Sequence, residues 1–213
     1  MKKITILFCS FLLIILHFGC TKIMFYQFGV RNPKVENKKS ILDYLTANNL
    51  STENSFCLQD TAALTKFYNR DIGTPEIRFY DRNGYLMLYR DNKKCNAQND
   101  SLITFLNPKN VIKIDSTNNL SEYLKQIKTL DGKDINPDEF KGYDYYLIMY
   151  WAKWTGKVNK IKMEDWEKSI VNKNDPKIKT IKVTTDYMDF WPLEKSDMIK
   201  IYSHKTKTTG KKH

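Results

Sequence analysis

The pattern of hydrophobic and polar residues predicts an alternation of helices and strands along the chain. Its strongest signal is the unbroken apolar run "YYLIMYWA" at residues 145–152. A strand that is apolar on both faces usually lies inside a sheet that is covered on both sides. Helical spacing over 157–172 and a further strand at 178–186 follow this run. Strand, helix and strand at this spacing predict a βαβ unit with two parallel strands.

Shorter elements are predicted upstream of this unit. An apolar face at helical spacing predicts a helix over 38–49, and the sequence "SFCL" predicts a strand at 55–58. Asp60 is predicted to cap a helix that continues to Asn69. Together with the βαβ unit, these elements favour the α/β fold class.

A β-hairpin is predicted in the middle of the chain. Two β-rich runs, 76–80 and 85–90, flank the pair Asn83-Gly84, whose positive φ angles suit a tight turn. Further along, the pattern predicts a helix at 99–107, a strand at 111–115 and an amphipathic helix at 119–130.

The first residues, "MKKITILFCSFLLIILHFGC", indicate a secretory signal, because two lysines precede an apolar run. The segment 1–20 ends in Gly19-Cys20 and resembles the lipobox of bacterial lipoproteins, in which the cysteine becomes the acylated N-terminus. His17 stands where that motif usually has Leu. An uncleaved membrane anchor from Ile4 to Val30 and simple secretion are the alternatives. All three place the folded part outside the cytoplasm, in the cell envelope.

The rest of the chain is interpreted as one domain with two flanking segments. Residues 21–37 lack periodicity and are interpreted as a tether between the membrane and the domain. The domain is predicted at 38–203. The basic, apolar-poor stretch 204–213 is predicted to be a disordered tail.

Composition and charge narrow the choice of partners. The chain has 213 residues, 41% of them hydrophobic, which is enough to build a core. Its formal net charge of +11 is typical of proteins that meet nucleic acid or an anionic membrane surface. Because the domain is predicted to be exported, we expect no nucleic-acid partner. Anionic lipid is the partner that the charge favours.

The cysteines and histidines offer little chemistry. Cys9 lies in the signal and Cys20 is the predicted lipid site, so the domain keeps Cys57 and Cys95. In an oxidising compartment these two predict a structural disulfide, with free buried thiols or a redox-active pair as alternatives. Histidine occurs only at positions 17, 204 and 213, outside the predicted elements. We therefore predict no catalytic triad, no metal site and no cofactor.

Two acidic residues follow the last predicted strand. Asp186 and Asp189 could line a cleft near Trp191. Their more economical interpretation is a solvated strand end.

Residues 130–154, "LDGKDINPDEFKGYDYYLIMYWAKW", resemble the entry to membrane-associated thiol-disulfide oxidoreductases of the thioredoxin superfamily, and to peroxiredoxins. Those sequences carry Leu-Asp-Gly-Lys, then Phe-Lys-Gly, an apolar strand and Trp-Ala-x-Trp-Cys-x-x-Cys. The matching residues here are Leu130 to Lys133, Phe140 to Gly142, and Trp151, Ala152 and Trp154. The resemblance implies a thioredoxin-like fold, a central mixed sheet flanked by helices.

A second segment, "GTPEIRFYDRNG" at 73–84, resembles the cis-proline loop and hairpin of the same superfamily. In the family this segment follows the βαβ unit, whereas here it precedes it. The resemblance therefore implies a circularly permuted thioredoxin-like domain. In that fold Pro75 would lie beside the turn at 154–157. The alternative is two partial α/β lobes with a chance match at 73–84.

The chain departs from the family at the residues that carry the chemistry. The two catalytic cysteines would fall at Thr155 and Val158. A threonine could cap the helix that follows, but its hydroxyl has no thiolate-like reactivity at neutral pH. Dithiol exchange by the family mechanism is therefore excluded at this turn.

What the resemblance implies instead is a binding surface without catalysis. Thioredoxin folds hold extended peptides against the cis-proline loop through backbone hydrogen bonds. The corresponding groove would consist of Thr74, Pro75, Trp154, Thr155, Gly156 and Lys157. Its expected partner is a protein or peptide of the cell envelope. The alternatives are an oxidoreductase that uses Cys57 and Cys95, and a structural envelope lipoprotein that acts through another surface such as the basic tail.

Overall fold

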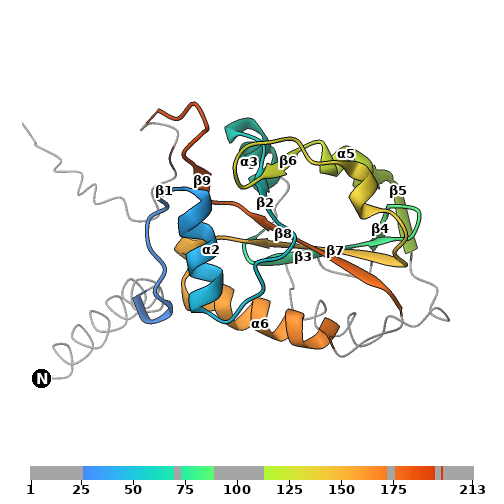
Figure 1. Ribbon diagram of the computed structural model, residues 1–213, viewed down its shortest axis with the longest axis horizontal. Coiled ribbons are helices and arrows are strands. Elements are labelled where there is room, and N and C mark those ends of the chain that lie inside the picture. Colours follow the sequence, from blue (N-terminus) through green and yellow to red (C-terminus); the bar gives the residue numbers. More distant parts are fainter. Residues whose placement is uncertain (1–25, 70–72, 89–112, 172–175, 195–197, 199–213) are drawn as a thin grey trace, which may run out of the picture.

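A computed structural model describes residues 26–69, 73–88, 113–171, 176–194 and 198. Within these residues, seven strands form one mixed sheet in the order β5-β4-β3-β7-β8-β2-β6 (Figure 1). The strands are β2 (Ser55–Leu58), β3 (Glu76–Asp81), β4 (Tyr85–Leu88), β5 (Lys113–Asn119), β6 (Ile127–Thr129), β7 (Tyr145–Trp151) and β8 (Ile178–Thr184). The α/β class predicted from the sequence is confirmed.

Strand β7 lies at the centre of the sheet. It pairs antiparallel with β3, where Tyr150 faces Glu76, and parallel with β8, where Tyr150 faces Val183. Helix α6 (Lys157–Val171) connects β7 to β8, so the predicted βαβ unit is confirmed. Because β3 belongs to the same sheet, the segment 73–84 and the βαβ unit do not form separate lobes.

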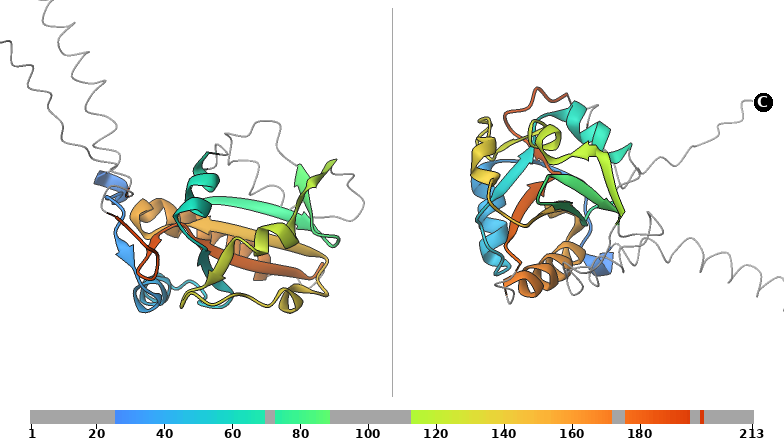
Figure 2. Two further views of the ribbon diagram at one scale, coloured as in Figure 1. Left: turned by 90° about the horizontal axis from the view of Figure 1, so that it is seen from above. Right: turned by 90° about the vertical axis from the view of Figure 1, so that its right-hand side faces the viewer.

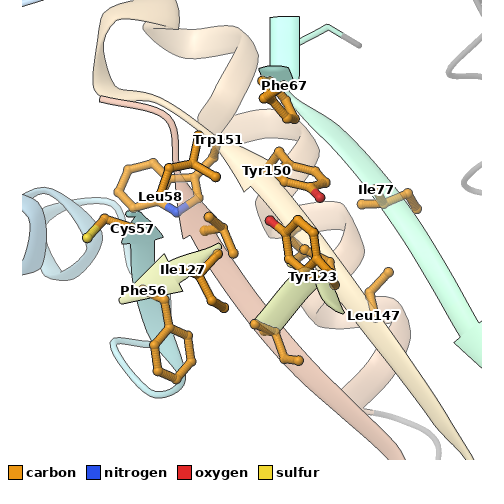
Figure 3. Close-up of a cluster of buried hydrophobic side chains, with 14 of the residues drawn as sticks. Phe56, Cys57, Leu58, Phe67, Ile77, Tyr123, Ile127, Leu147, Tyr150 and Trp151 are labelled. Atoms are coloured by element: carbon orange, nitrogen blue, oxygen red, sulfur yellow. The ribbon is translucent and has the colours of Figure 1, made fainter. Parts of the chain in front are cut away.

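Helices cover both faces of this sheet. Figure 1 shows α2 (Lys38–Ala47) and α6 on one side, and α3 (Thr61–Tyr68) and α5 (Leu120–Leu124) on the other. Successive side chains of a strand point to opposite faces. Accordingly, Trp151 stacks on Tyr44 of α2, with ring centroids 5.5 Å apart. Tyr150 lies between Phe67 of α3 and Tyr123 of α5 on the other face (Figure 3).

A buried ion pair fixes α6 on its face of the sheet. Lys182 of β8 is only 2% exposed, although it carries a charge. Its ammonium group donates to Glu167 of α6 at 2.9 Å and to the carbonyl of Ser51. Burial lowers the pKa of Lys182, and the Glu167 carboxylate opposes that shift. Removing one partner of such a pair would leave an uncompensated buried charge.

The predicted hairpin is present, with one difference at its turn. Strands β3 and β4 pair antiparallel around Asp81 to Gly84. Of the pair Asn83-Gly84, Gly84 alone has a positive φ, at 79°. The Asp81 carboxylate accepts from the backbone of Asn83 and Tyr85, so a side chain stabilises the turn.

The amphipathic helix predicted at 119–130 is half wrong. Helix α5 ends at Leu124, and β6 follows almost at once. Ile127, which falls within the predicted helix, is buried, but it lies opposite Leu58 of β2 in an antiparallel pair. Pairing with the edge of the sheet therefore overrides the helical spacing of these residues.

The remaining predictions fall into two groups. Helix α2, strand β2 and the Asp60 cap of α3 are confirmed, since the Asp60 side chain accepts from the backbone of Ala63. The helix predicted at 99–107, the signal at 1–20 and the tail at 204–213 lie outside the described residues. Short 3₁₀ helices complete the fold, η1 (Pro137–Phe140) and η2 (Lys153–Thr155).

The first described residues pack on the domain. We refer to residues 26–36 as the strap. Its last two residues form β1 (Val35–Glu36), which pairs parallel with β9 (Tyr187–Met188). The tether predicted at 21–37 therefore includes an ordered part of the fold. Among the described residues, no helix has the length and apolar character that a membrane crossing needs.

Candidate functional site

The turn after β7 is where the resemblance predicts the site. Helix η2 carries Trp154 and Thr155, and Gly156 with a φ of 63° leads into α6. Trp154 is partly exposed, whereas Thr155 is 4% exposed. The Thr155 hydroxyl donates to the carbonyl of Ala152 at 2.8 Å, so it closes the 3₁₀ turn and does not cap α6. No nucleophile is presented at this position.

The cis-proline segment lies at the same end of the sheet. The Thr74–Pro75 peptide bond is cis, and β3 runs from Glu76 alongside β7. The Thr74 and Thr185 hydroxyl oxygens are 3.4 Å apart. The Thr185 backbone N–H in turn donates to the carbonyl of Trp151 at 2.7 Å. Thr74 and Pro75 are thus connected to the end of β7, the strand that leads into the turn.

The strap covers the turn itself. The Arg31 N–H donates to the carbonyl of Trp154 at 2.9 Å. A Cβ atom on Gly156 would lie 2.3 Å from the Phe28 carbonyl oxygen and 2.6 Å from that of Gly29. Real Cβ contacts are never this short, so only glycine permits the approach. Both views of Figure 2 show the first described residues, in blue, beside α6.

An ion pair secures the other end of the strap. The Lys153 ammonium lies 2.5 Å from the Glu36 carboxylate, with 17% and 13% of the two side chains exposed. The Ser40 hydroxyl of α2 donates to the same carboxylate oxygen at 2.7 Å. Because both side chains are mostly shielded from water, removing either partner would leave the other charge buried and uncompensated. The strap is therefore attached at both ends of its path over the turn.

Asp186 lies beneath this pair and corrects an expectation from the sequence. It is 1% exposed, whereas a solvated strand end was predicted; Asp189 is exposed as expected. One Asp186 oxygen accepts from the Lys153 N–H and from the Thr184 hydroxyl, both at 2.8 Å. The other has no hydrogen-bond partner among the described residues. Burial raises the pKa of Asp186 to about 6, against the effect of these hydrogen bonds.

The sequence analysis did not predict a second buried polar side chain near the turn, that of Asn159. Asn159 of α6 is fully buried, and its side chain lies beside the Tyr44 hydroxyl of α2. Helical spacing at 157–172 predicts an inward face from apolar residues and gives no reason to place an asparagine there. Ile161, which fits that apolar pattern, is instead 50% exposed.

Cys57 does not resemble a reactive thiol. It is buried in β2 (Figure 3). Its sulfur contacts the carbonyls of Lys128 and Thr129. Burial raises the pKa of the Cys57 thiol to about 12, so it stays protonated at neutral pH. The structure has Cys57 as a free thiol, and Cys95 lies outside the described residues. A disulfide between them stays a prediction.

An open cleft lies on the α3 side of the site. It has a volume of about 450 Å³ and is lined mainly by α3 residues together with Tyr187. Tyr68 lines this cleft and donates to the Thr185 hydroxyl at 3.4 Å. Since Thr74 approaches the same hydroxyl, the cleft adjoins the cis-proline segment.

The structure therefore places the predicted groove residues in two separate sets. Thr74 and Pro75 adjoin the open cleft, whereas Trp154, Thr155 and Gly156 lie under or beside the strap. Lys157 is exposed at the start of α6.

No protein-family model matches the chain, and no curated protein or solved structure shows significant similarity to it.

Replacing Gly156 by Ala is expected to release the strap. The added Cβ would overlap the Phe28 and Gly29 carbonyls, so the backbone amides within 31–36, Pro33 apart, should exchange roughly tenfold faster or more. Native-state hydrogen exchange of the full chain measures this. Gly142→Ala is the matched control, because Gly142 also has a positive φ but has no atom within 4 Å of the added Cβ. Equal effects of the two variants on the strap would contradict the close contact.

Stability is expected to depend on pH through Asp186. Its pKa rises from 3.8 in the unfolded chain to about 6 in the fold. The folded state therefore binds the proton more tightly, and the contribution is fully present below pH 3.8 and lost as the pH rises through 6. Asp186→Asn should remove this fall, which is about 3 kcal/mol over its whole range. Urea unfolding between pH 4 and pH 7 measures it.

The control for this experiment is Asp189→Asn, an exposed neighbour that should leave the pH dependence unchanged. If the free energies of unfolding of the Asp186 and Asp189 variants depend on pH in the same way, Asp186 is not a buried ionisable group in the fold.

Proposed function

We propose that the protein is a membrane-anchored, thioredoxin-like module of the cell envelope that binds an extended polypeptide segment and performs no thiol chemistry. The observation that carries the proposal is the position of the cis-proline segment. Thr74 reaches Thr185, and Thr185 bonds to the end of β7, as a permuted thioredoxin-like arrangement requires. Strand β3 beside β7 supports the same arrangement.

The chemistry of the turn supports binding over catalysis. Thr155 is buried and uses its hydroxyl within the turn, and Val158 has no reactive atom. Cys57 lies on another strand and is protonated at neutral pH. A thiol-disulfide oxidoreductase needs an accessible thiolate, which none of these side chains supplies.

The proposed binding surface has two parts: the strap covers one, and the cleft leaves the other open. The strap occupies the turn through backbone contacts, such as that of Arg31 with Trp154. The open cleft beside Tyr68 and Tyr187 is left for a partner. Its walls combine hydroxyl groups of Thr61 and Thr65 with apolar and aromatic surface, which suits a polypeptide segment with mixed side chains.

The location in the envelope rests on the sequence of residues 1–20. A secretory signal that ends in a lipobox-like Gly19-Cys20 would anchor the chain six residues before Tyr26. The proposed partner is therefore a protein or peptide that is exposed at the same membrane.

A photo-crosslinking amino acid placed at Thr65 is expected to capture one partner polypeptide in the cells that make this protein. Thr65 is exposed at the edge of the cleft, whereas Asp165 is exposed on α6 across the sheet and serves as the control position. Ala62→Arg, which fills the cleft, should abolish the adduct. Envelope fractionation and mass spectrometry detect it. Equal adducts from Asp165, or an adduct that survives Ala62→Arg, would contradict the proposal.

A further inference from the structure

A basic and aromatic surface surrounds the start of the strap. Tyr26 is 87% exposed and Phe28 is 36% exposed, although both have large apolar rings. Gly156, the residue before α6, contacts the carbonyls of Phe28 and Gly29, so the first turn of α6 adjoins them. That turn contributes the exposed Lys157, and the exposed Ile161 follows it on α6.

Cations extend this surface along the strap. Arg31 and Lys34 are exposed and line a cleft of about 270 Å³ together with the partly exposed Trp154. Among the described residues, no ion pair involves Arg31, Lys34 or Lys157. We refer to Tyr26, Phe28, Arg31, Lys34, Lys157 and Ile161 as the N-terminal patch.

We infer that the N-terminal patch is the surface with which the domain lies on an anionic lipid bilayer. The inference rests on the proposed anchoring for one step, the reach of the chain. Five residues lie between Cys20 and Tyr26, and the six residue steps from one to the other span at most about 20 Å when fully extended. Under the anchor alternative, the chain leaves the membrane even closer to the patch. This end of the domain must therefore face the bilayer.

Its chemistry suits that position. Aromatic rings with a polar edge are enriched at the level of lipid headgroups, and basic residues beside a membrane anchor are attracted to anionic lipids. Tyr26 and Phe28 would enter the headgroup region, and Arg31, Lys34 and Lys157 would contact phosphates. The net charge of +11 favours the same partner. The strap would then contact the membrane on its outer side and the turn on its inner side.

Lysine footprinting of the full chain tests this orientation. The chain is added to vesicles of phosphatidylcholine alone or of phosphatidylcholine with phosphatidylglycerol, and lysines are labelled by reductive methylation. Lys34 and Lys157 should lose reactivity on the anionic vesicles, whereas Lys66 and Lys113, which are exposed on α3 and β5, should not. Arg31→Glu should abolish the loss, and Lys66→Glu, with the same charge change, should preserve it.

Flotation of the same samples separates this inference from the proposed anchoring. If the chain floats with both vesicle types but Lys34 and Lys157 stay as reactive as Lys66 and Lys113, the inference is overturned and the anchoring stands. If the chain floats only with anionic vesicles and the two lysines are protected, the patch is supported and the anchoring fails. Protection of Lys66 or Lys113 instead would assign the contact with the vesicle to another face of the domain and would overturn the inference.

Discussion

The pairing of β7 on both of its edges is the constraint on which the rest of the structure depends. Because β3 and β8 take up its backbone groups, its side chains can be apolar on both faces. Two helical layers then become necessary, since each face needs a cover. The same pairing brings the start of β3 next to the ends of β7 and β8. The cis-proline segment, the turn and Asp186 therefore meet at one end of the sheet.

At that end, polar groups are kept out of water at a cost in stability. Asp186 retains a carboxylate in a fully buried position, where two donors of the described part of the chain, the Lys153 N–H and the Thr184 hydroxyl, support it. The strap contributes to this arrangement, because its Glu36 pairs with Lys153, whose backbone N–H holds Asp186. In the proposed function, the strap covers the turn, and the turn takes part in no thiol chemistry. Binding then falls to the neighbouring cleft, which the strap leaves open.

The sequence predicted the elements whose signal is local. β7 follows from apolar residues on both faces, and α3 from the cap at Asp60. The failures involve contacts between distant segments. Ile127 fits a helix by spacing but joins β2 as a strand, and Asp186 looks solvated until Lys153, 33 residues earlier, approaches it. The strap was missed because it contacts Gly156 through carbonyl groups, which side-chain patterns do not report. The sequence therefore gave no sign that the strap lies against Trp154 and Gly156.

The central claim is that the turn without thiols is closed by the chain's own strap. The most direct test is the exchange rate of the Arg31 amide, followed by NMR in the full chain. Arg31 has an exposed side chain, so its amide would exchange freely unless it bonds to the Trp154 carbonyl. The account predicts an amide protected to the same extent as those of β1. Exchange at the rate of an unstructured peptide would show an open turn and contradict it.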